Sequence, residues 1–357
     1  MNKADTFVIL SPGFPKDEDD STCVPPQQVF VKSLKETFPQ LHIVVLAFEY
    51  PYKAAKYQWN GIDVIAFGGS NKGGLSRILN WRKIRAKLGE LHSKHHVIGL
   101  LSFWLGDCAL IGSRFAKHKN LKHLCWILGQ DAKKGNRYFK LIKPQPASLI
   151  ALSDFIADEV AKNYKVTPEH LIPPGIDPGM FGKPVPKRDI DILGAGSLIP
   201  LKQFYMLIEL VNSLKDVFPD IKAVICGGGA EMTSLKAMIH DLGLEHQITL
   251  TGELPHDQVL KRMQRSKVFV HPSAYEGFGV VCLEALYAGA HVVSLVKPMK
   301  ADIKNWHIAR SQSDMVDLVR ELLNDQDNDH KPVAPYLIKD SSVAMMKLFG
   351  YNESATS

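Results

Sequence analysis

The sequence of 357 residues lacks the marks of a secreted, metal-clustered or membrane-spanning protein. Its five cysteines are odd in number and widely spaced, and no C-x-x-C pair occurs, which argues against a disulfide framework and a cysteine zinc site. No apolar run approaches the roughly 20 residues that a membrane-spanning helix needs. The apolar run that follows Asp5 is too short for a signal peptide and has no small-residue cleavage site. The sequence therefore predicts a cytoplasmic protein with reduced cysteines.

The net charge is small in total but unevenly distributed along the chain. The chain carries +6 at pH 7. Residues 1–150 hold 22 lysines and arginines against 11 acids, a net +11, whereas residues 151–357 hold 21 against 26, a net −5. A basic half favours a nucleic-acid or membrane-surface partner. Because no recognisable nucleic-acid module is present, we expect no nucleic-acid partner.

The basic excess is densest in residues 71–97, where seven lysines and arginines accompany one acid, Glu90. Leucine, isoleucine and tryptophan side chains alternate with these cations. A cationic helix with such apolar side chains can lie on an anionic membrane surface. The segment therefore predicts peripheral contact with the inner face of a membrane. The alternative is a solvated helix that covers a sheet.

Short apolar runs alternate with segments of helical period along the whole chain. Strand candidates include residues 6–10 and 97–101 in the first half and residues 190–194 and 268–271 in the second. Continuous apolar strands separated by helices predict parallel sheets that are covered on both faces. The proline-rich stretch 172–186 separates the two groups. The sequence thus predicts the α/β class, with two doubly wound domains whose ligand-binding strand ends face a central cleft.

The most informative segment runs from His271 to Leu286, H-P-S-A-Y-E-G-F-G-V-V-C-L-E-A-L. Its pattern indicates a strand end, a glycine-flanked loop and a helix that begins near Val280, with the positive end of the helix toward the loop. Glu276 lies in the loop and Glu284 lies about one turn into the helix. Carboxylates there can accept hydrogens from sugar or ribose hydroxyls, and the helix end suits a phosphate. The alternative is a helix start with an incidental acid.

Two glycine turns accompany this segment. The first follows the strand at residues 190–194, and Lys202 comes shortly after it, where a lysine can meet a diphosphate as a mobile point charge. Taken alone, Lys202 would be a solvated surface lysine. The second turn, Gly227-Gly228-Gly229, lacks the complete phosphate-binding patterns and predicts a tight turn between a strand and a helix.

These motifs, in this order, resemble the group 1 (family 4-like) retaining glycosyltransferases with the GT-B fold. The resemblance covers residues 171–295 and extends more faintly into the first half. Residues 172–177 with Phe181 are similar to the interdomain P-x-G-[IV]-D…F stretch of the family. Residues 194–202 resemble its phosphate-binding turn, and residues 271–286 are similar to its E-x7-E motif.

The resemblance implies a hexosyltransferase that moves a sugar from a nucleotide-diphosphate donor to an acceptor hydroxyl with retention of anomeric configuration. The acceptor would be a glycan or glycolipid, in glycan, lipopolysaccharide or glycolipid assembly. The GT-B fold implies two Rossmann-like domains, residues 1–176 on the acceptor side and residues 177–333 on the donor side. Residues 334–357 would be a C-terminal segment that packs back on the first domain. No cofactor and no metal are implied, because basic side chains and helix dipoles take the place of a divalent cation.

The resemblance also implies roles for individual residues. Glu276 would hold the hydroxyls of the donor sugar, Lys202 would neutralise the departing diphosphate, and both count as catalytic residues. Glu284 would bind the nucleotide ribose, and Asp131 is a candidate on the acceptor side. The remaining implied donor contacts are Gly13, Ser197, Gly277, Phe278, Gly279, Val280 and Val281.

Three positions depart from the pattern of the family. Ser197 stands where the family usually has arginine, Leu128 replaces the histidine of its H-G-x-D motif, and residues 296–300 replace a glycine-rich stretch. The departures leave two alternatives open. One is a non-catalytic protein of the same fold that binds nucleotide-sugars or glycans, and the other is a GT-B sugar-nucleotide epimerase.

Overall fold

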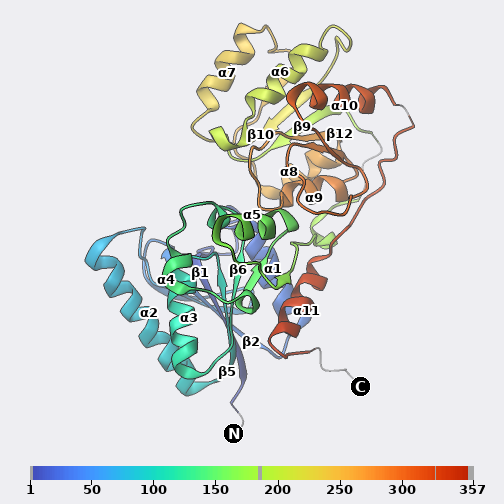
Figure 1. Ribbon diagram of the computed structural model, residues 1–357. Coiled ribbons are helices and arrows are strands. Elements are labelled where there is room, and N and C mark those ends of the chain that lie inside the picture. Colours follow the sequence, from blue (N-terminus) through green and yellow to red (C-terminus); the bar gives the residue numbers. More distant parts are fainter. Residues whose placement is uncertain (1–2, 184–186, 326, 353–357) are drawn as a thin grey trace. The chain divides into compact units, whose positions relative to one another are not determined.

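A computed structural model describes residues 3–183, 187–325 and 327–352 (Figure 1). The chain forms two compact units, residues 1–175 together with 338–357, and residues 176–337. The boundaries predicted from the sequence lie after residues 176 and 333. Residues 184–186 of the predicted proline-rich stretch and residues 353–357 of the predicted C-terminal segment lie outside the described residues.

The first unit is built on an eight-stranded sheet with the order β3-β4-β2-β1-β5-β6-β7-β8. Every neighbouring pair is parallel except β3 with β4. The strands are β1 (Asp5–Gly13), β2 (His42–Tyr50), β3 (Ala55–Trp59), β4 (Ile62–Ala66), β5 (His96–Phe103), β6 (His123–Ile127), β7 (Leu149–Ala151) and β8 (His170–Leu171).

The edge strand β3 was not among the predicted strands, because it has no continuous apolar run. It pairs with β4 through a two-residue turn, Asn60-Gly61, and both turn residues have positive φ. An Asn-Gly pair between two short strands is a strong hairpin signal, since both residues tolerate this backbone region. The sequence therefore contains a local signal for this hairpin, although not an apolar run.

Helices cover both faces of this sheet. α2 (Gly74–Lys94) and α3 (Asp107–Lys119) pack against one face, where their apolar side chains meet Val8 and Leu10 of β1. α1 (Pro25–Thr37) and α11 (Ile338–Leu348) pack against each other, and Phe349, just after α11, meets Phe7 of β1 edge to face at 4.8 Å. Because successive strand side chains point to opposite faces, Phe7 and Val8 belong to different layers. The remaining helices are α4 (Tyr138–Ile142) and α5 (Asp154–Tyr164).

The second unit is a six-stranded sheet in which every neighbouring pair is parallel. In its order, β11-β10-β9-β12-β13-β14, the first strand, β9, lies in the middle. The next two strands are added on one side of β9 and the last three on the other side. This is the doubly wound arrangement, so the predicted α/β class with two Rossmann-like parallel-sheet domains is confirmed. The strands are β9 (Ile190–Ala195), β10 (Ala223–Cys226), β11 (Ile248–Leu250), β12 (Ser266–His271), β13 (His291–Ser294) and β14 (Trp306–Ile308).

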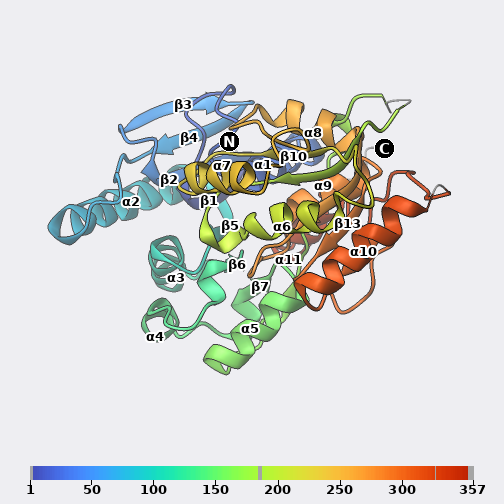
Figure 2. The same ribbon diagram turned by 90° about the horizontal axis from the view of Figure 1, so that it is seen from above.

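Helices cover both faces of this sheet as well (Figure 2). α6 (Tyr205–Leu214), α7 (Met232–Asp241) and α10 (Gln312–Asn324) share one core cluster with buried strand residues such as Ile192 and Val268. α8 (His256–Gln264) and α9 (Val280–Tyr287) contact each other, and α8 also contacts β9 and β12, whereas α9 contacts β12 and β13. Among the residues that the structure describes, none of the helices has the length and hydropathy needed to cross a membrane.

Candidate functional site

The candidate site lies at the carboxyl edge of the second sheet, between β9 and β12. These two strands are neighbours and run parallel, so the loops that follow them meet at the same edge. The strand order also reverses at this point, since β10 lies on the other side of β9. Open α/β sheets bind their ligands at such a switch point. The loop after β9 carries Lys202, and the loop after β12 carries Glu276.

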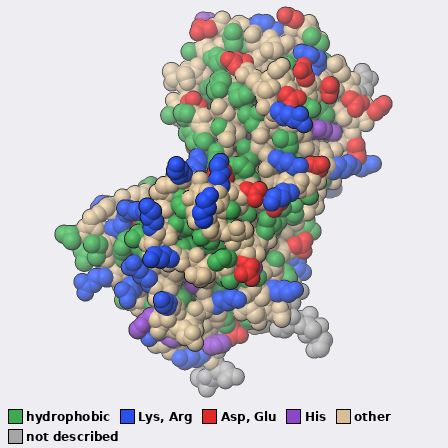
Figure 3. Space-filling model, in the orientation of Figure 1, with side chains coloured by type: hydrophobic (Ala, Val, Ile, Leu, Met, Phe, Trp, Pro, Cys, Tyr) green, Lys and Arg blue, Asp and Glu red, His purple; other side chains and the backbone are tan. Residues whose placement is uncertain are grey.

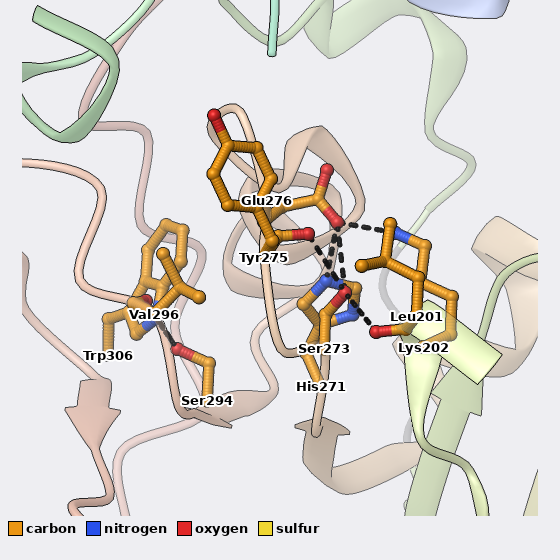
Figure 4. Close-up of polar contacts among 9 residues, drawn as sticks. All are labelled: Leu201, Lys202, His271, Ser273, Tyr275, Glu276, Ser294, Val296 and Trp306. Carbon is orange, nitrogen blue, oxygen red and sulfur yellow. Dashed lines mark hydrogen bonds and ion pairs between the residues drawn. The ribbon is translucent and has the colours of Figure 1, made fainter. Parts of the chain in front are cut away.

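Three side chains converge on one oxygen of Glu276 (Figure 4). The ammonium group of Lys202 forms an ion pair with Oε2, His271 Nε2 lies 3.1 Å from the same oxygen, and Ser273 Oγ lies 3.5 Å from it. The side chains of Glu276 and Lys202 are 22% and 19% exposed, so a ligand can reach both. In Figure 4 the second carboxylate oxygen points away from these partners. That oxygen can accept hydrogen bonds from a bound sugar.

The charges at the site follow from burial and from these contacts. Burial raises the pKa of Glu276, but the hydrogen bond with His271 and the charge of Lys202 outweigh burial and lower it to about 2. Burial also lowers the pKa of His271, whose side chain is 3% exposed. At neutral pH the carboxylate is therefore ionised and His271 is neutral. Because a carboxylate only accepts hydrogen bonds, His271 Nε2 carries the hydrogen and donates it to Glu276.

The two loops are also fastened to each other through Leu201. The backbone N–H of Ala274 donates to the carbonyl oxygen of Leu201 at 3.0 Å, and the hydroxyl of Ser273 donates to the same oxygen at 3.4 Å. Leu201 directly precedes Lys202, so these bonds fix the backbone that carries the ammonium group (Figure 4). The predicted catalytic residues Glu276 and Lys202 are thus brought together, although 74 positions separate them.

The glycine loop before α9 brings backbone rather than side chains to the site. Gly279 has φ +82°, a conformation that favours glycine, and a Cβ there would lie 3.4 Å from Glu276 Cγ. The side chain of Phe278 is buried, with ring centroids 6.0 Å from Trp306 and 5.8 Å from Tyr336. Only the backbone of Phe278 can therefore meet a ligand, as it can for Gly277.

The start of α9 presents backbone N–H groups beside this loop. Val280 and Val281 are its first two residues, and the first N–H groups of a helix have no partner within the helix. Together with the helix dipole they favour an anion at this end. Val280 and Val281 thus lie where a diphosphate can be bound by backbone, next to Glu276.

Glu284, one turn farther along α9, has a histidine partner that the sequence pattern did not indicate. Its Oε1 atom lies 2.9 Å from Nε2 of His256, the first residue of α8. The hydrogen bond with Glu284 raises the pKa of His256 against the opposing effect of burial. The two residues are 28 positions apart and belong to different helices, so the sequence held no signal for this contact. His271, in contrast, was visible in the H-P-S start of the segment.

Ser197 lies in the turn after β9 and is exposed. Gly196, beside it, packs against Gly227, where a Cβ atom would overlap the carbonyl oxygen of Gly196. Leu198 N–H donates to the carbonyl of Gly228 at 2.8 Å, which joins the turn after β9 to the turn after β10. The three glycines at 227–229 therefore allow two backbone turns to approach closely, the tight turn that their sequence predicted.

Two of the predicted residues, Gly13 and Asp131, belong to the first unit. Gly13 ends β1, and a Cβ there would lie 3.3 Å from Tyr50 Cβ. The buried carboxylate of Asp131 accepts N–H bonds from Leu105 at 2.8 Å and Gly129 at 2.9 Å, and Leu128 N–H lies 3.1 Å away. Burial raises the pKa of Asp131 and these amides oppose that shift. Asp131 thus holds the loops after β5 and β6 together. Its predicted role on the side of the sugar acceptor stays a prediction.

The described residues contain no group of three or more histidines, cysteines and acids arranged to hold a metal ion. The polar groups of the site are instead one lysine, two acids with histidine partners, and the backbone of a helix start. Such a set can bind hydroxyls and an anionic phosphate group at neighbouring positions.

The family model for glycosyl transferases group 1 matches residues 179–334. The chain is 26% identical over 174 residues to the phosphatidylinositol N-acetylglucosaminyltransferase gpi3 subunit of Schizosaccharomyces pombe, which is 48% of this chain and 38% of the relative. It is 32% identical over 145 residues to the GDP-mannose-dependent alpha-(1-6)-phosphatidylinositol monomannoside mannosyltransferase of Mycolicibacterium smegmatis, 35% of this chain and 37% of that protein. The chain thus spans less than two thirds of the length of these relatives.

Solved structures show the same fold over nearly the whole chain. HepE of Anabaena, crystallised in complex with UDP and glucose, superposes with a TM-score of 0.65 at 14% identity and covers 96% of this chain and 95% of its own. At that identity the likeness shows the fold, which is GT-B. Residues 179–334 thus match the model of the group 1 glycosyl transferases, and the likeness to solved structures shows the GT-B fold for the chain.

Proposed function

We propose that this protein is a retaining hexosyltransferase, which moves a sugar from a nucleoside-diphosphate donor to a hydroxyl of a glycan or glycolipid. The second unit would be the donor side and the first unit the acceptor side. The observation that carries the proposal is the Lys202–Glu276 ion pair beside the start of α9, at the switch point of a doubly wound sheet. A cation, an ionised acid and helix N–H groups at one edge suit a diphosphate bonded to a sugar.

Each group of the site has a role in this proposal. Oε1 of Glu276 accepts from the sugar hydroxyls while His271 holds Oε2. The N–H groups of Val280 and Val281 bind the diphosphate, and Glu284 accepts from the ribose. Further donor contacts would come from Ser197, from the backbone of residues 277–279, and from Gly13. Asp131 would act on the acceptor side through the loops that it fastens.

The proposed reaction needs no protein nucleophile. The acceptor hydroxyl attacks the anomeric carbon on the face from which the diphosphate leaves, and an oxygen of the leaving diphosphate takes the hydroxyl proton. Lys202 stabilises the negative charge that develops on that group, since its ammonium is held in place by Glu276 and by the Leu201 contacts. Losing one such contact typically raises the barrier by about 3 kcal/mol, a factor of about 100 in rate. We propose that the transfer requires no metal ion and no cofactor, because Lys202 and α9 supply the positive charge.

The substrate classes are supported by the names of the similar proteins. Two relatives are named for transfer to phosphatidylinositol-based lipids, which favours a glycolipid acceptor. The HepE structure contains UDP and glucose, which favours a nucleotide-sugar donor. We also propose a cytoplasmic protein bound peripherally to the inner face of a membrane, since the acceptor lipid would lie there.

A donor screen followed by a transfer assay tests the proposal. UDP-, GDP- and ADP-sugars are compared by thermal shift, and the best donor is incubated with glycan and lipid acceptors. NMR of the product reports its anomeric configuration. Glu276→Gln should lower kcat/KM by about 100-fold, whereas Glu245→Gln, on an exposed surface of the same unit, should leave it unchanged.

Four results would each contradict the proposal. Full activity of Glu276→Gln would remove Glu276 from the mechanism. Donor binding without transfer or hydrolysis would favour the non-catalytic alternative. Conversion of the donor sugar without any acceptor would favour the epimerase, and an inverted product would exclude retention.

A further inference from the structure

The outer surface of α2 carries large apolar side chains that the fold does not bury. Leu75, Ile78 and Leu79 are 79%, 50% and 56% exposed. Single exposed leucines are common, but a contiguous apolar patch usually marks an interaction site. These three residues form a continuous group, because positions three and four apart are neighbours on a helix. Figures 1 and 2 show the first turns of α2 projecting beyond the strands of its sheet.

The helix geometry shows that these three residues do not belong to the side of α2 that packs on the sheet. The side of α2 that packs on the sheet carries Ile84, Leu88 and Leu91, all buried. At 100° per residue, Leu75, Ile78 and Leu79 lie on the opposite side of the helix. Arg82 continues this outer side toward the end of the helix, and Lys83 and Arg85 lie on its two flanks; all three are exposed. The outer side of α2 is therefore apolar at its start and cationic beyond it.

A hollow of about 470 Å³ lies on the flank of α2, between α2 and α4, and its lining residue Trp81 follows Ile78 by one helical turn. It is lined by Trp81 of α2 and by Arg137, Tyr138, Lys140 and Leu141. Leu141 is 51% exposed. Two cations, a tyrosine and a tryptophan with an apolar rim suit a phosphate-bearing headgroup whose chains continue into an apolar medium. Figure 3 shows lysine and arginine side chains gathered around the hydrophobic ones over α2.

Asp107 holds the two helices in this arrangement. It starts α3, accepts a hydrogen bond from the hydroxyl of Tyr138, and lies 3.5 Å from Nε of Arg77 on α2. One carboxylate thus ties the starts of α2, α3 and α4. The apolar group and the hollow therefore form one preorganised surface, which we call the α2–α4 face: Leu75, Ile78, Leu79, Trp81, Arg82, Lys83, Arg85, Arg137, Tyr138, Lys140 and Leu141.

We propose that the α2–α4 face docks on an anionic phospholipid bilayer. Leu75, Ile78, Leu79 and Leu141 insert at the boundary between headgroups and acyl chains, and the hollow takes a lipid phosphate between Arg137 and Lys140. Charge complementarity selects this occupant, since α2 carries six lysines and arginines against Glu90 alone. A second copy of the chain would bring like charges together. The inference refines the membrane contact proposed above and rests on that part of it, but not on catalysis.

Vesicle co-sedimentation of the full chain tests the inference without any turnover measurement. Vesicles of neutral phosphatidylcholine are compared with vesicles that also contain phosphatidylglycerol. Binding should require the anionic lipid and should weaken as salt rises. Removing three charges with Arg82→Gln, Lys83→Gln and Arg85→Gln should weaken it about 100-fold, because each surface cation contributes about 1 kcal/mol. The apolar double variant Leu75→Asn, Leu79→Asn should weaken it at least about tenfold.

The matched control removes the same number of charges from the other end of the same unit. Lys117→Gln, Lys119→Gln and Lys122→Gln change exposed residues at and after the end of α3. Asp107, which contacts α2 and α4, starts that helix, so this end lies about 18 Å from Asp107 along the helix axis. The control should reduce binding only slightly.

Three outcomes would overturn the inference. The first is no binding to anionic vesicles at low salt, and the second is equal weakening by the control and by the α2 variant. The third is concentration-dependent dimerisation that Leu79→Asn abolishes, which would assign the face to a second copy. Glycosyl transfer to a soluble acceptor that is unchanged in the α2 variants would separate loss of docking from loss of the proposed function.

Discussion

The two acids of the candidate site each have a histidine partner, and the pKa values of the two histidines are shifted in opposite directions. His271 is deeply buried, so burial lowers its pKa and it meets Glu276 as a neutral donor. His256 is less buried, and its hydrogen bond with Glu284 raises its pKa. Neutral His271 fixes Glu276 without neutralising its charge, which leaves Lys202 as the ionic partner. Glu284 instead has a partner whose charge depends on pH.

Replacing His256 should affect nucleotide binding rather than the chemical step. In His256→Gln the titratable imidazole is lost, and Glu284 loses the contact that would orient it toward the ribose in the proposed function. We expect a higher KM for the donor, by about tenfold, and a kcat close to that of the wild type, since one hydrogen bond to a charged group contributes about 1.5 kcal/mol. Steady-state kinetics with varied donor measures both constants.

The pH dependence distinguishes this positioning role from a general loss of structure in the variant. Because the pKa of His256 is raised, its ion pair with Glu284 is complete at low pH and is lost as pH rises through that pKa. The wild-type KM should therefore rise as the pH increases above 6.5, the ordinary pKa of histidine, and the variant should lack this rise. A pH-independent difference between the two proteins would contradict the positioning role.

A buried histidine cluster should make the protein less stable in mild acid. His291 begins β13 and is 6% exposed, with the rings of His307 and His330 each 5.5 Å away. Burial, together with these neighbours, lowers the pKa of His291 to about 4. Between pH 6.5 and 4 the unfolded chain binds a proton that the folded chain does not, so stability falls as pH falls, by about 3 kcal/mol.

Urea unfolding at pH about 7 and about 4.5 measures this loss. His291→Gln cannot titrate, so its unfolding free energy should change less between the two pH values than that of the wild type. Equal changes in both proteins would assign the acid sensitivity to other groups. The comparison uses the pH difference within each protein, so a constant destabilisation by the substitution does not matter.

At the scale of elements, the turns after β9 and β10 act as one unit. The close approach of Gly227 to Gly196 and the bond from Leu198 to Gly228 leave no space for a side chain. The turn after β9 leads directly to the 3₁₀ turn Pro200–Lys202. A change in the turn after β10 should therefore reach Lys202 through the backbone.

Gly227→Ala should destabilise the second unit by about 3 kcal/mol or more, because a Cβ atom would overlap backbone and φ is +149°. The control Gly243→Ala also has positive φ, +64°, but no atom lies within 4 Å of the added Cβ. It should destabilise by only about 1 kcal/mol. Hydrogen exchange of β9 and β10 measures both effects, and equal effects would show that overlap is not the cause.

At the scale of the whole molecule, the end of the chain belongs to the first unit, although the second unit intervenes. α11 packs on α1, and its residues Met345 and Met346 are fully buried. Ser342 Oγ on α11 also donates to Ser33 Oγ on α1 at 3.0 Å. The first unit therefore cannot complete its core until α11 has been made.

Met346→Ala should destabilise the first unit by about 2–5 kcal/mol through the cavity that it leaves. Hydrogen exchange followed by mass spectrometry should show faster exchange in β1, β2 and α1. The strands of the second unit, β9 to β14, should be unchanged, since α11 is not part of their core. An equal increase in hydrogen-exchange rate in both units would show that the two units unfold together.

The sequence by itself determined the elements and the local parts of the site. Continuous apolar runs define parallel strands, and the strand, loop and helix of residues 271–286 place Glu276 and Glu284 by local geometry alone. Such features depend on neighbours within a few turns of chain, whose conformational preferences are visible in the order of residue types. The edge strand β3 belongs to this class too, although its Asn-Gly signal was missed.

The tertiary structure decided which distant residues meet. Lys202 reaches Glu276 because β9 and β12 are neighbours, and His256 reaches Glu284 because α8 packs on α9. It also divided the apolar residues of α2 into a buried side and the exposed group at Leu75. Strand order and helix packing follow from burial of apolar surface over the whole unit. That burial is a non-local free energy, which the pattern of any single segment does not contain.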